Sequence, residues 1–206
     1  VLEEGVHSGD ASGVVPSSFR ILRQLLARLE DINTGKVIVE ELNAPIPAER
    51  VAQAKAAAKA LGEDVYAKFP FVEGMKPNGA DLAELVLNRT WRPALSVTGL
   101  AGAPAPLDAG NVLRPFTEAK LSMRVPPTTD GKKASTKMKQ ILEADPPYGA
   151  RVTYAPEKDG SGWNAPKTAP WLEKALEASS QAVYGKPMAM MGEGGSIPFM
   201  GMLGEK

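Results

Sequence analysis

One stretch with strict alternation constrains the fold more than any other. In "TEAKLSMRVPP", which begins at Thr117, apolar and polar side chains alternate residue by residue. The apolar positions are Ala119, Leu121, Met123 and Val125, and the polar positions between them are Lys120, Ser122 and Arg124. Successive side chains of a strand point to opposite faces, so this pattern predicts an antiparallel strand with one buried face. The two prolines that follow end the strand.

Helical patterns are interleaved with further strand patterns along the chain. Apolar residues at helical spacing, capping residues and a terminal glycine predict helices over residues 16–31, 47–62, 80–88 and 131–143. Alternation predicts strands within residues 92–102 and 150–156, and a short strand at Val1 and Leu2. Between them, Val112 and Leu113 can pair briefly with a neighbour inside a proline-rich loop. This order predicts an α+β fold: a two-layer sandwich with an antiparallel sheet and helices on one face.

The last part of the chain is too small to fold alone. After "EKDGSGW", the sequence predicts a helix over residues 168–185, a buried strand over residues 186–192 and a glycine-rich turn that enters another helix. These elements cannot bury enough apolar surface for independent stability. We therefore expect this part to belong to another domain, and the absence of an initiator methionine and of a tail suggests a fragment.

Composition excludes several classes of function. The 24 basic and 24 acidic residues cancel, and no segment concentrates one sign of charge, so we expect neither a nucleic-acid nor a membrane partner. The chain has no cysteine, which excludes disulfides, thiolate nucleophiles and Cys-ligated zinc. It shows neither a signal peptide nor a long apolar run, and we expect a cytoplasmic protein.

The only histidine, His7, lies in "GVHSGDASG" near the start of the chain. On its own it could be an ordinary surface or turn residue. A triad of His7 with Ser8 and Asp10 is excluded, because neighbouring strand residues face opposite ways. One histidine and the solvated pair Glu3 and Glu4 are too few ligands for a metal site within this chain.

Five short motifs, taken in order, nevertheless resemble one family. They are "GVHSGDASG", "RPALSVTGLAG", "GNVLRP", "LSMRVPP" and "EGGSIP". The chain resembles the di-zinc metallopeptidases that include aminoacylases, carboxypeptidases and carnosinase-like dipeptidases. The resemblance implies an enzyme with two domains: a catalytic domain that holds two zinc ions, and an inserted ferredoxin-like lid that forms a homodimer. It implies that residues 1–12 are a strand leading from the catalytic domain, 13–160 the lid and dimerisation domain, and 161–206 an incomplete part of the catalytic domain.

The same resemblance implies roles for individual residues. His7 would reach into the active site of the partner subunit and donate a hydrogen bond to the carbonyl oxygen under attack. Arg124 would bind the terminal carboxylate of the substrate, for which a planar guanidinium is suited. Asn111 would lie near the substrate carbonyl or carboxylate, although carnosinase-like relatives often carry threonine there. Gly195 and Ser196 of "EGGSIP" would bind the substrate carboxylate from the catalytic domain.

The metal ligands and the general base of this family have no counterpart in the sequence. We therefore expect the chain alone to bind no zinc and to hydrolyse nothing, while the parent enzyme cleaves peptide or N-acyl amide bonds with metal-activated water. The substrate would be a small peptide or an N-acyl amino acid. Two alternatives stay open: a free-standing dimerisation or binding module of the same fold, and an α+β structural domain whose motifs are accidental.

Overall fold

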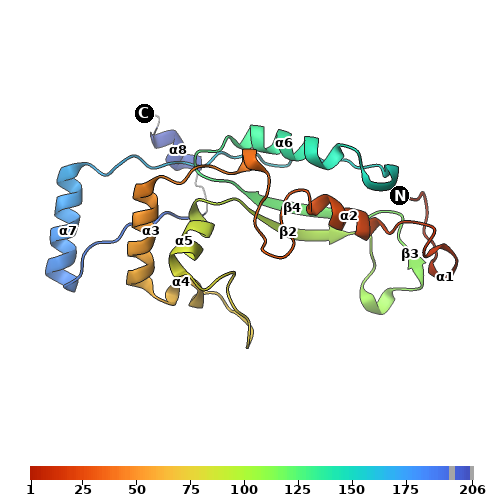
Figure 1. Cartoon of the computed structure of the whole chain (residues 1–206), viewed down its shortest axis with the longest axis horizontal. Coiled ribbons are helices and arrows are strands. Elements are labelled where there is room, and N and C mark those ends of the chain that lie inside the picture. The colour runs from red at the N-terminus through yellow and green to blue at the C-terminus, as the bar shows by residue number, and fades with distance from the viewer. Residues whose placement is uncertain (195–197, 205–206) are drawn as a thin grey trace. The chain divides into compact units, whose positions relative to one another are not determined.

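The structure, a computed structural model, describes residues 1–194 and 198–204 (Figure 1). The chain divides into two compact units. Unit 1 consists of residues 1–43, 93–125 and 130–159. Unit 2 consists of residues 44–92, 126–129 and 160–206. Each unit is built from segments that are far apart in sequence.

A long two-stranded ribbon forms the framework of unit 1. Strand β2 (Ala94–Ala101) pairs antiparallel with β4 (Glu118–Arg124), so that Leu95 lies opposite Met123 and Val97 opposite Leu121. A bulge between Val97 and Gly99 leaves Thr98 as an extra residue, and Leu100 then lies opposite Ala119. Directly opposed residues share a face, so the bulge keeps Leu100 on the same face as Leu95 and Val97.

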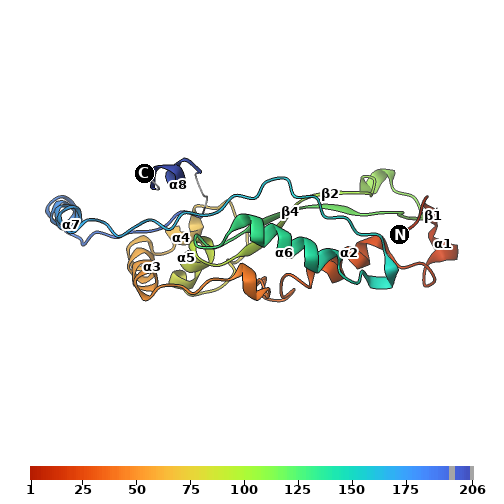
Figure 2. The same ribbon diagram turned by 90° about the horizontal axis from the view of Figure 1, so that it is seen from above.

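Two amphipathic helices, α2 (Ser18–Leu26) and α6 (Gly131–Glu143), cover this face of the ribbon (Figures 1 and 2). Helix α6 begins after Asp130, whose side chain accepts a hydrogen bond from the Lys133 amide at 3.0 Å. The buried core lies between the helices and the ribbon. It consists of Ile21, Leu25, Leu29, Val37, Val39, Leu42, Ala134, Met138 and Leu142.

A second, smaller ribbon extends unit 1 beyond the Ala101 end of β2. Strand β1 (Val6–His7) pairs antiparallel with β3 (Val112–Leu113), and the single-turn helix α1 (Ser8–Ala11) follows β1 directly. Short 3-10 helices over Glu40–Leu42, Pro106–Asp108 and Pro147–Gly149 connect the remaining segments.

Unit 2 is mainly helical. Helices α3 (Ala48–Leu61), α4 (Asp64–Ala67) and α5 (Leu82–Thr90) pack around a core of Ala54, Ala58, Val65, Val86, Leu87 and Trp91. Small alanine side chains line the buried side of α3, which permits close helix packing. The unit also contains α7 (Pro170–Tyr184) and α8 (Pro198–Gly204). None of the described helices, over residues 1–194 and 198–204, has the length and apolar character needed to cross a membrane.

The predicted fold class is confirmed: the fold is α+β, with antiparallel pairing and helices on one face of the ribbon. The brief pairing of Val112 and Leu113 is also confirmed. Three predicted strands are wrong, since residues 1–2, 150–156 and 186–192, all described by the structure, form none. At Tyr154 the reason is visible, because its amide donates to Glu143 Oε1 at 2.7 Å instead of to a neighbouring strand.

Candidate functional site

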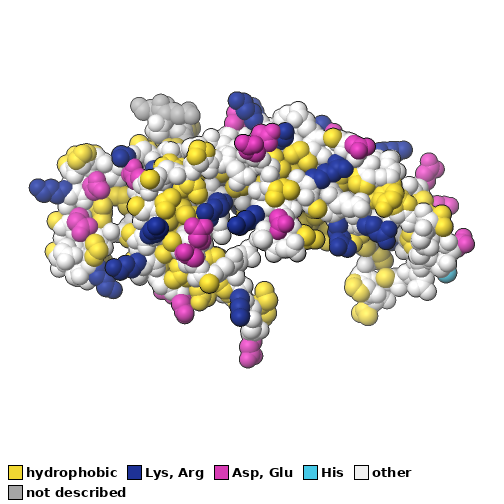
Figure 3. All heavy atoms as spheres, in the orientation of Figure 1, with side chains coloured by type: hydrophobic (Ala, Val, Ile, Leu, Met, Phe, Trp, Pro, Cys, Tyr) yellow, Lys and Arg dark blue, Asp and Glu magenta, His cyan; other side chains and the backbone are white. Residues whose placement is uncertain are grey.

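His7 lies where β1 ends and α1 begins. Its backbone is extended, and its ring Nδ1 accepts a hydrogen bond from the Gly9 amide at 3.1 Å. A Cβ atom at Gly9 would lie 2.9 Å from Cε1 of the ring, so the ring rests against bare backbone. The side chain is exposed, and the imidazole lies on the surface of the molecule (Figure 3). The "HSG" motif therefore places an imidazole at the surface with one of its two nitrogens already engaged.

Asn111 is held next to His7 by the small ribbon. His7 lies opposite Val112, and the Ser8 amide donates to the Asn111 carbonyl oxygen at 2.8 Å. Gly5 lets the strands approach, because a Cβ atom there would lie 2.7 Å from Val112 Cγ1. The structure thus brings together two of the predicted site residues, His7 and Asn111, through backbone pairing.

Arg124 lies at the other end of unit 1's main ribbon. It is the last residue of β4, opposite Ala94, and its side chain is exposed on the face that α2 and α6 leave uncovered. Among the residues that the structure describes, no side chain or carbonyl pairs with its guanidinium. The seven residues of β4 span about 20 Å, and His7 and Asn111 lie beyond the Glu118 end. Within one chain, Arg124 is therefore not brought to His7.

The predicted residues Gly195 and Ser196 lie outside the described residues. The segment just before them is held by α5 of unit 2. Arg89 Nη2 contacts both carboxylate oxygens of Glu193, at 2.7 and 2.8 Å. A Cβ atom at Gly194 would clash with the Arg89 carbonyl oxygen, so this close approach requires glycine. Neither Arg89 nor Glu193 was predicted from the sequence, since they are 104 positions apart and no local pattern links them.

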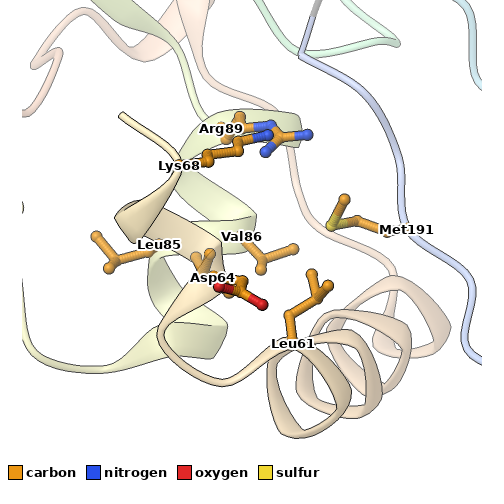
Figure 4. Close-up of a pocket in the computed structure, with 8 residues that line it drawn as sticks. Leu61, Asp64, Lys68, Leu85, Val86, Arg89 and Met191 are labelled. Carbon is orange, nitrogen blue, oxygen red and sulfur yellow. The ribbon is translucent and has the colours of Figure 1, made fainter. Parts of the chain in front are cut away.

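The described part of each unit contains a hollow. In unit 2, a pocket of about 230 Å³ has a largely apolar wall that includes Leu61, Val86 and Met191 (Figure 4). Asp64, Lys68 and Arg89 add charge to its lining. In unit 1, a wider and more open hollow of about 450 Å³ lies beside the small ribbon. Phe19, Leu100, Val112 and Arg114 contribute to its lining.

The carboxyl groups with shifted pKa values lie away from the predicted site residues. The Thr34 hydroxyl and backbone amide hydrogen bond to Asp31 and lower the pKa of its carboxyl. The Lys139 ammonium and the Tyr154 amide lower the pKa of Glu143 in the same way. Burial raises the pKa of Glu30. Asp31 fixes a turn and Glu143 a helix end, and none of these three carboxyl groups provides a general base beside His7.

The residues do not fit a metal site. Over residues 1–194 and 198–204, no group of three or more histidine, aspartate or glutamate side chains is arranged to hold a metal ion. Zinc in proteins is held by three or four such ligands or by cysteines, which the sequence lacks. No chemical step is therefore assigned to a metal bound by the described part of this chain.

Comparison with known proteins identifies a matching family model and relatives that are named as dipeptidases. Residues 1–150 match the family model described as "Peptidase dimerisation domain". The chain is 29% identical, over 203 residues, to the Cys-Gly metallodipeptidase DUG1 of Saccharomyces cerevisiae, covering 94% of this chain and 40% of that protein. It is 25% identical to a cysteinylglycine-S-conjugate dipeptidase of Corynebacterium striatum, covering 96% of this chain and 41% of that protein. The chain thus spans about 40% of the length of these curated relatives.

Solved structures show the same fold. Human carnosine dipeptidase 1 superimposes with a TM-score of 0.71 at 19% identity, covering 100% of this chain and 44% of that one. An M20 family metallo-carboxypeptidase of Sulfolobus solfataricus superimposes with a TM-score of 0.63 at 19% identity, covering 95% of this chain and 49% of that one. The family model covers most of the chain and includes the whole of unit 1 up to Ala150. The chain therefore belongs to the peptidase dimerisation domain family.

Proposed function

We propose that this chain supplies the dimerisation domain and part of the substrate site of a metal-dependent dipeptidase that cleaves peptide or N-acyl amide bonds. The two curated relatives, named as dipeptidases, support this proposal. Residues 13–160 would form the lid and dimerisation domain, and residues 1–12 the strand that leads into it. Residues 161–206 would complete a catalytic domain, which agrees with the exposed apolar side chains of α7, among them Trp171 at 72% exposure.

The separation of His7 from Arg124 is the observation that carries the proposal. Both side chains are exposed, yet β4 holds them about 20 Å or more apart within one chain. A dipeptide is much shorter than this distance, so one chain cannot use both groups on one substrate. Two chains related by a twofold axis can, if each site takes His7 and Asn111 from one subunit and Arg124 from the other.

The proposed chemistry follows from the residue types. The His7 imidazole donates a hydrogen bond to the substrate carbonyl oxygen and stabilises the negative charge that develops on it in the transition state. The Arg124 guanidinium pairs with the terminal carboxylate, and Asn111 contributes an amide near the same end of the substrate. Gly195 and Ser196 bind that carboxylate from the catalytic domain.

The parent enzyme would contain two zinc ions. Because the described residues do not form a metal site, we propose that residues outside this sequence hold both ions. The chain contributes binding, orientation and dimerisation. An alternative is a free-standing dimerisation module, which the lack of a ligand set among the described residues also fits.

The dimer would form through unit 1, with a second copy of this chain as the partner. The family to which the chain belongs is named for dimerisation, which supports this proposal. Exposed apolar side chains on α2 and β2 also support it. Phe19 is 51% exposed and Leu100 is 62% exposed. In addition, β2 is paired on one edge only among the described strands, so its other edge can pair with a second sheet.

Mixed dimers of the complete gene product test the proposal. His7→Ala should lower kcat about 100- to 1000-fold and change KM little, since its hydrogen bond tightens in the transition state. Arg124→Ala should mainly raise KM. A dimer with one subunit of each variant should have one intact site, because both substitutions then lie in the other site.

Randomly mixed subunits should then recover about a quarter of the wild-type activity, since about half of the dimers are mixed. Without metal-dependent amide hydrolysis in the complete product, the dipeptidase assignment is wrong and the binding module is favoured. If hydrolysis occurs but mixing restores nothing, both residues act within one subunit and the shared site is excluded.

A further inference from the structure

We propose that the main-chain amide of Gly9 fixes the His7 imidazole in the tautomer that carries its proton on Nε2. Gly9 is then a positioning residue for the hydrogen bond that His7 donates, and this catalytic meaning rests on the proposed function. The tautomer itself follows from the local geometry of the chain and can be measured without any reaction.

One of the two ring nitrogens of His7, Nδ1, already takes part in a hydrogen bond. Nδ1 accepts a hydrogen bond from the Gly9 amide at 3.1 Å, and an accepting ring nitrogen must present its lone pair. A neutral imidazole carries one proton, so that proton is on Nε2. Nε2 therefore offers only an N–H donor to the exterior.

The N–H donor at Nε2 limits which chemical groups His7 can bind. An exposed N–H donor fits a carbonyl oxygen, and fits better the oxyanion that the carbonyl becomes. It does not fit a metal ion or a proton to be abstracted, because both need a free lone pair at Nε2. The geometry thus favours one of the possible roles of a histidine, electrophilic assistance, over general-base catalysis.

Glycine is required at position 9 because of the approach between ring and backbone. A Cβ atom there would lie 2.9 Å from Cε1 and 3.1 Å from Nδ1. Since Nδ1 is the acceptor itself, a methyl group at this position would push away the atom that the amide must reach. The backbone of Gly9 does not need a positive φ, so an alanine would act through this contact and not through backbone strain.

The test is nitrogen NMR on this chain labelled with ¹⁵N in the histidine ring and the backbone. The sequence has a single histidine, so the two ring resonances belong to His7 without ambiguity. In buffer where the ring is neutral, we expect a protonated Nε2, an unprotonated Nδ1 and a scalar coupling between Nδ1 and the Gly9 amide nitrogen. A protonated Nδ1 overturns the inference, whether or not any variant folds.

Gly9→Ala and a matched control sharpen the test. Gly110→Ala serves as the control, because a Cβ atom there meets nothing within 4 Å and the backbone φ is not positive. We expect Gly9→Ala to abolish the coupling and mix the two tautomers, and Gly110→Ala to leave both unchanged. If Gly9→Ala retains the coupling and a single tautomer, Gly9 is not the positioning residue.

Activity measurements then separate this inference from the proposed function. In the complete enzyme, Gly9→Ala should lower kcat by up to about 100-fold and change KM little, as expected for a misplaced donor. If the spectra support the Nε2–H tautomer while His7→Ala leaves kcat unchanged, the proposed function fails and the tautomer assignment stands. If the spectra show protonated Nδ1 while His7→Ala still lowers kcat, the tautomer assignment fails and the proposed function stands.

Discussion

Helices α6 and α7 have similar amphipathic sequences but very different surroundings. Helix α6, in unit 1, buries Ala134, Met138 and Leu142 against its own ribbon and α2. Helix α7, in unit 2, lies wholly within the described residues and buries none of its side chains. Trp171, Val183 and Tyr184 of α7 are each more than 70% exposed. This difference shows that apolar periodicity identifies a helix face that can be buried. It does not show whether the same chain provides the surface that covers this face.

The two units therefore differ in how self-sufficient they are. Unit 1 contains a closed core between two helices and a ribbon, and it carries His7, Asn111 and Arg124. In the described part of unit 2, a compact core lies around α3 to α5. We expect substitutions in unit 1 to affect stability in this chain, and substitutions on α7 to matter only when its proposed partner surface is present.

The largest expected effect comes from a matched pair of leucines. Leu29 is fully buried in unit 1, whereas Leu176 on α7 is 43% exposed. Leu29→Ala should lower the free energy of unfolding by about 3 to 5 kcal/mol, because it removes packing and leaves a cavity. Leu176→Ala should change it by less than about 0.5 kcal/mol. Urea denaturation of both variants measures the difference, and equal losses would show that α7 is packed within this chain.

The next effect concerns the helix ends of unit 1. The Arg28 guanidinium donates to the carbonyl oxygens of Ile141, Ala144 and Asp145, at 3.1, 2.5 and 2.8 Å. Arg28→Ala should cost about 2 kcal/mol, since it leaves the end of α6 without these charge-assisted bonds. Arg28→Lys keeps the charge but not the fork of donors, so it should recover only part of the loss. Full recovery in thermal or urea unfolding would mean that the charge alone is sufficient.

A smaller effect is expected for the ion pair of unit 2. Arg89 and Glu193 form a bidentate contact, but the glutamate side chain is 71% exposed, so solvent screens the attraction. A double-mutant cycle with Arg89→Gln and Glu193→Gln should give a coupling of about 0.5 kcal/mol. In the complete enzyme the same variants should raise KM, because the pair holds the segment that leads to Ser196. A coupling above about 2 kcal/mol would show a far more enclosed contact.

The smallest effect per residue is the response to acid. The folded-state pKa values of Asp31 and Glu143 are lowered by their hydrogen bonds, so these bonds stabilise the folded state above the unfolded pKa values. That stability is lost as the pH falls from the unfolded pKa values through the lowered ones. Glu30 acts in the opposite direction, because its pKa is raised by burial. Unfolding of Glu143→Gln between pH 7 and pH 3 should show a weaker pH dependence than wild type.

Much of unit 1 could be predicted from local sequence. The helical pattern predicts α6 over residues 131–143, and the structure has Gly131–Glu143, with Asp130 as its N-cap. The strand predicted after α6, over residues 150–156, is wrong, because the backbone amide of Tyr154 donates its hydrogen bond to the Glu143 side chain. Local patterns report which residues suit a strand, but a competing side-chain acceptor in the folded state decides whether pairing occurs.

For the candidate site, too, the sequence predicted residues but not how distant residues are arranged. The "HSG" and "GNVLRP" motifs identified His7 and Asn111, and the pairing of β1 with β3 brings their backbones together. No pattern in the sequence indicated that Arg124 lies at the opposite end of the long ribbon, or that Arg89 holds Glu193. Distances of this kind depend on how segments are arranged in three dimensions, which residue types alone do not specify.

The extra residue Thr98 has a consequence for how the surface of β2 can vary. Before the bulge odd-numbered residues point toward the helices, and after it even-numbered residues do, which is why Leu100 shares a side with Leu95. Deleting Thr98 would remove the bulge and leave Gly99 opposite Lys120 and Leu100 opposite Ala119, so Leu100 would stay on the helix side. One residue can thus be gained or lost at this point of β2 without moving an apolar side chain from one surface of the ribbon to the other.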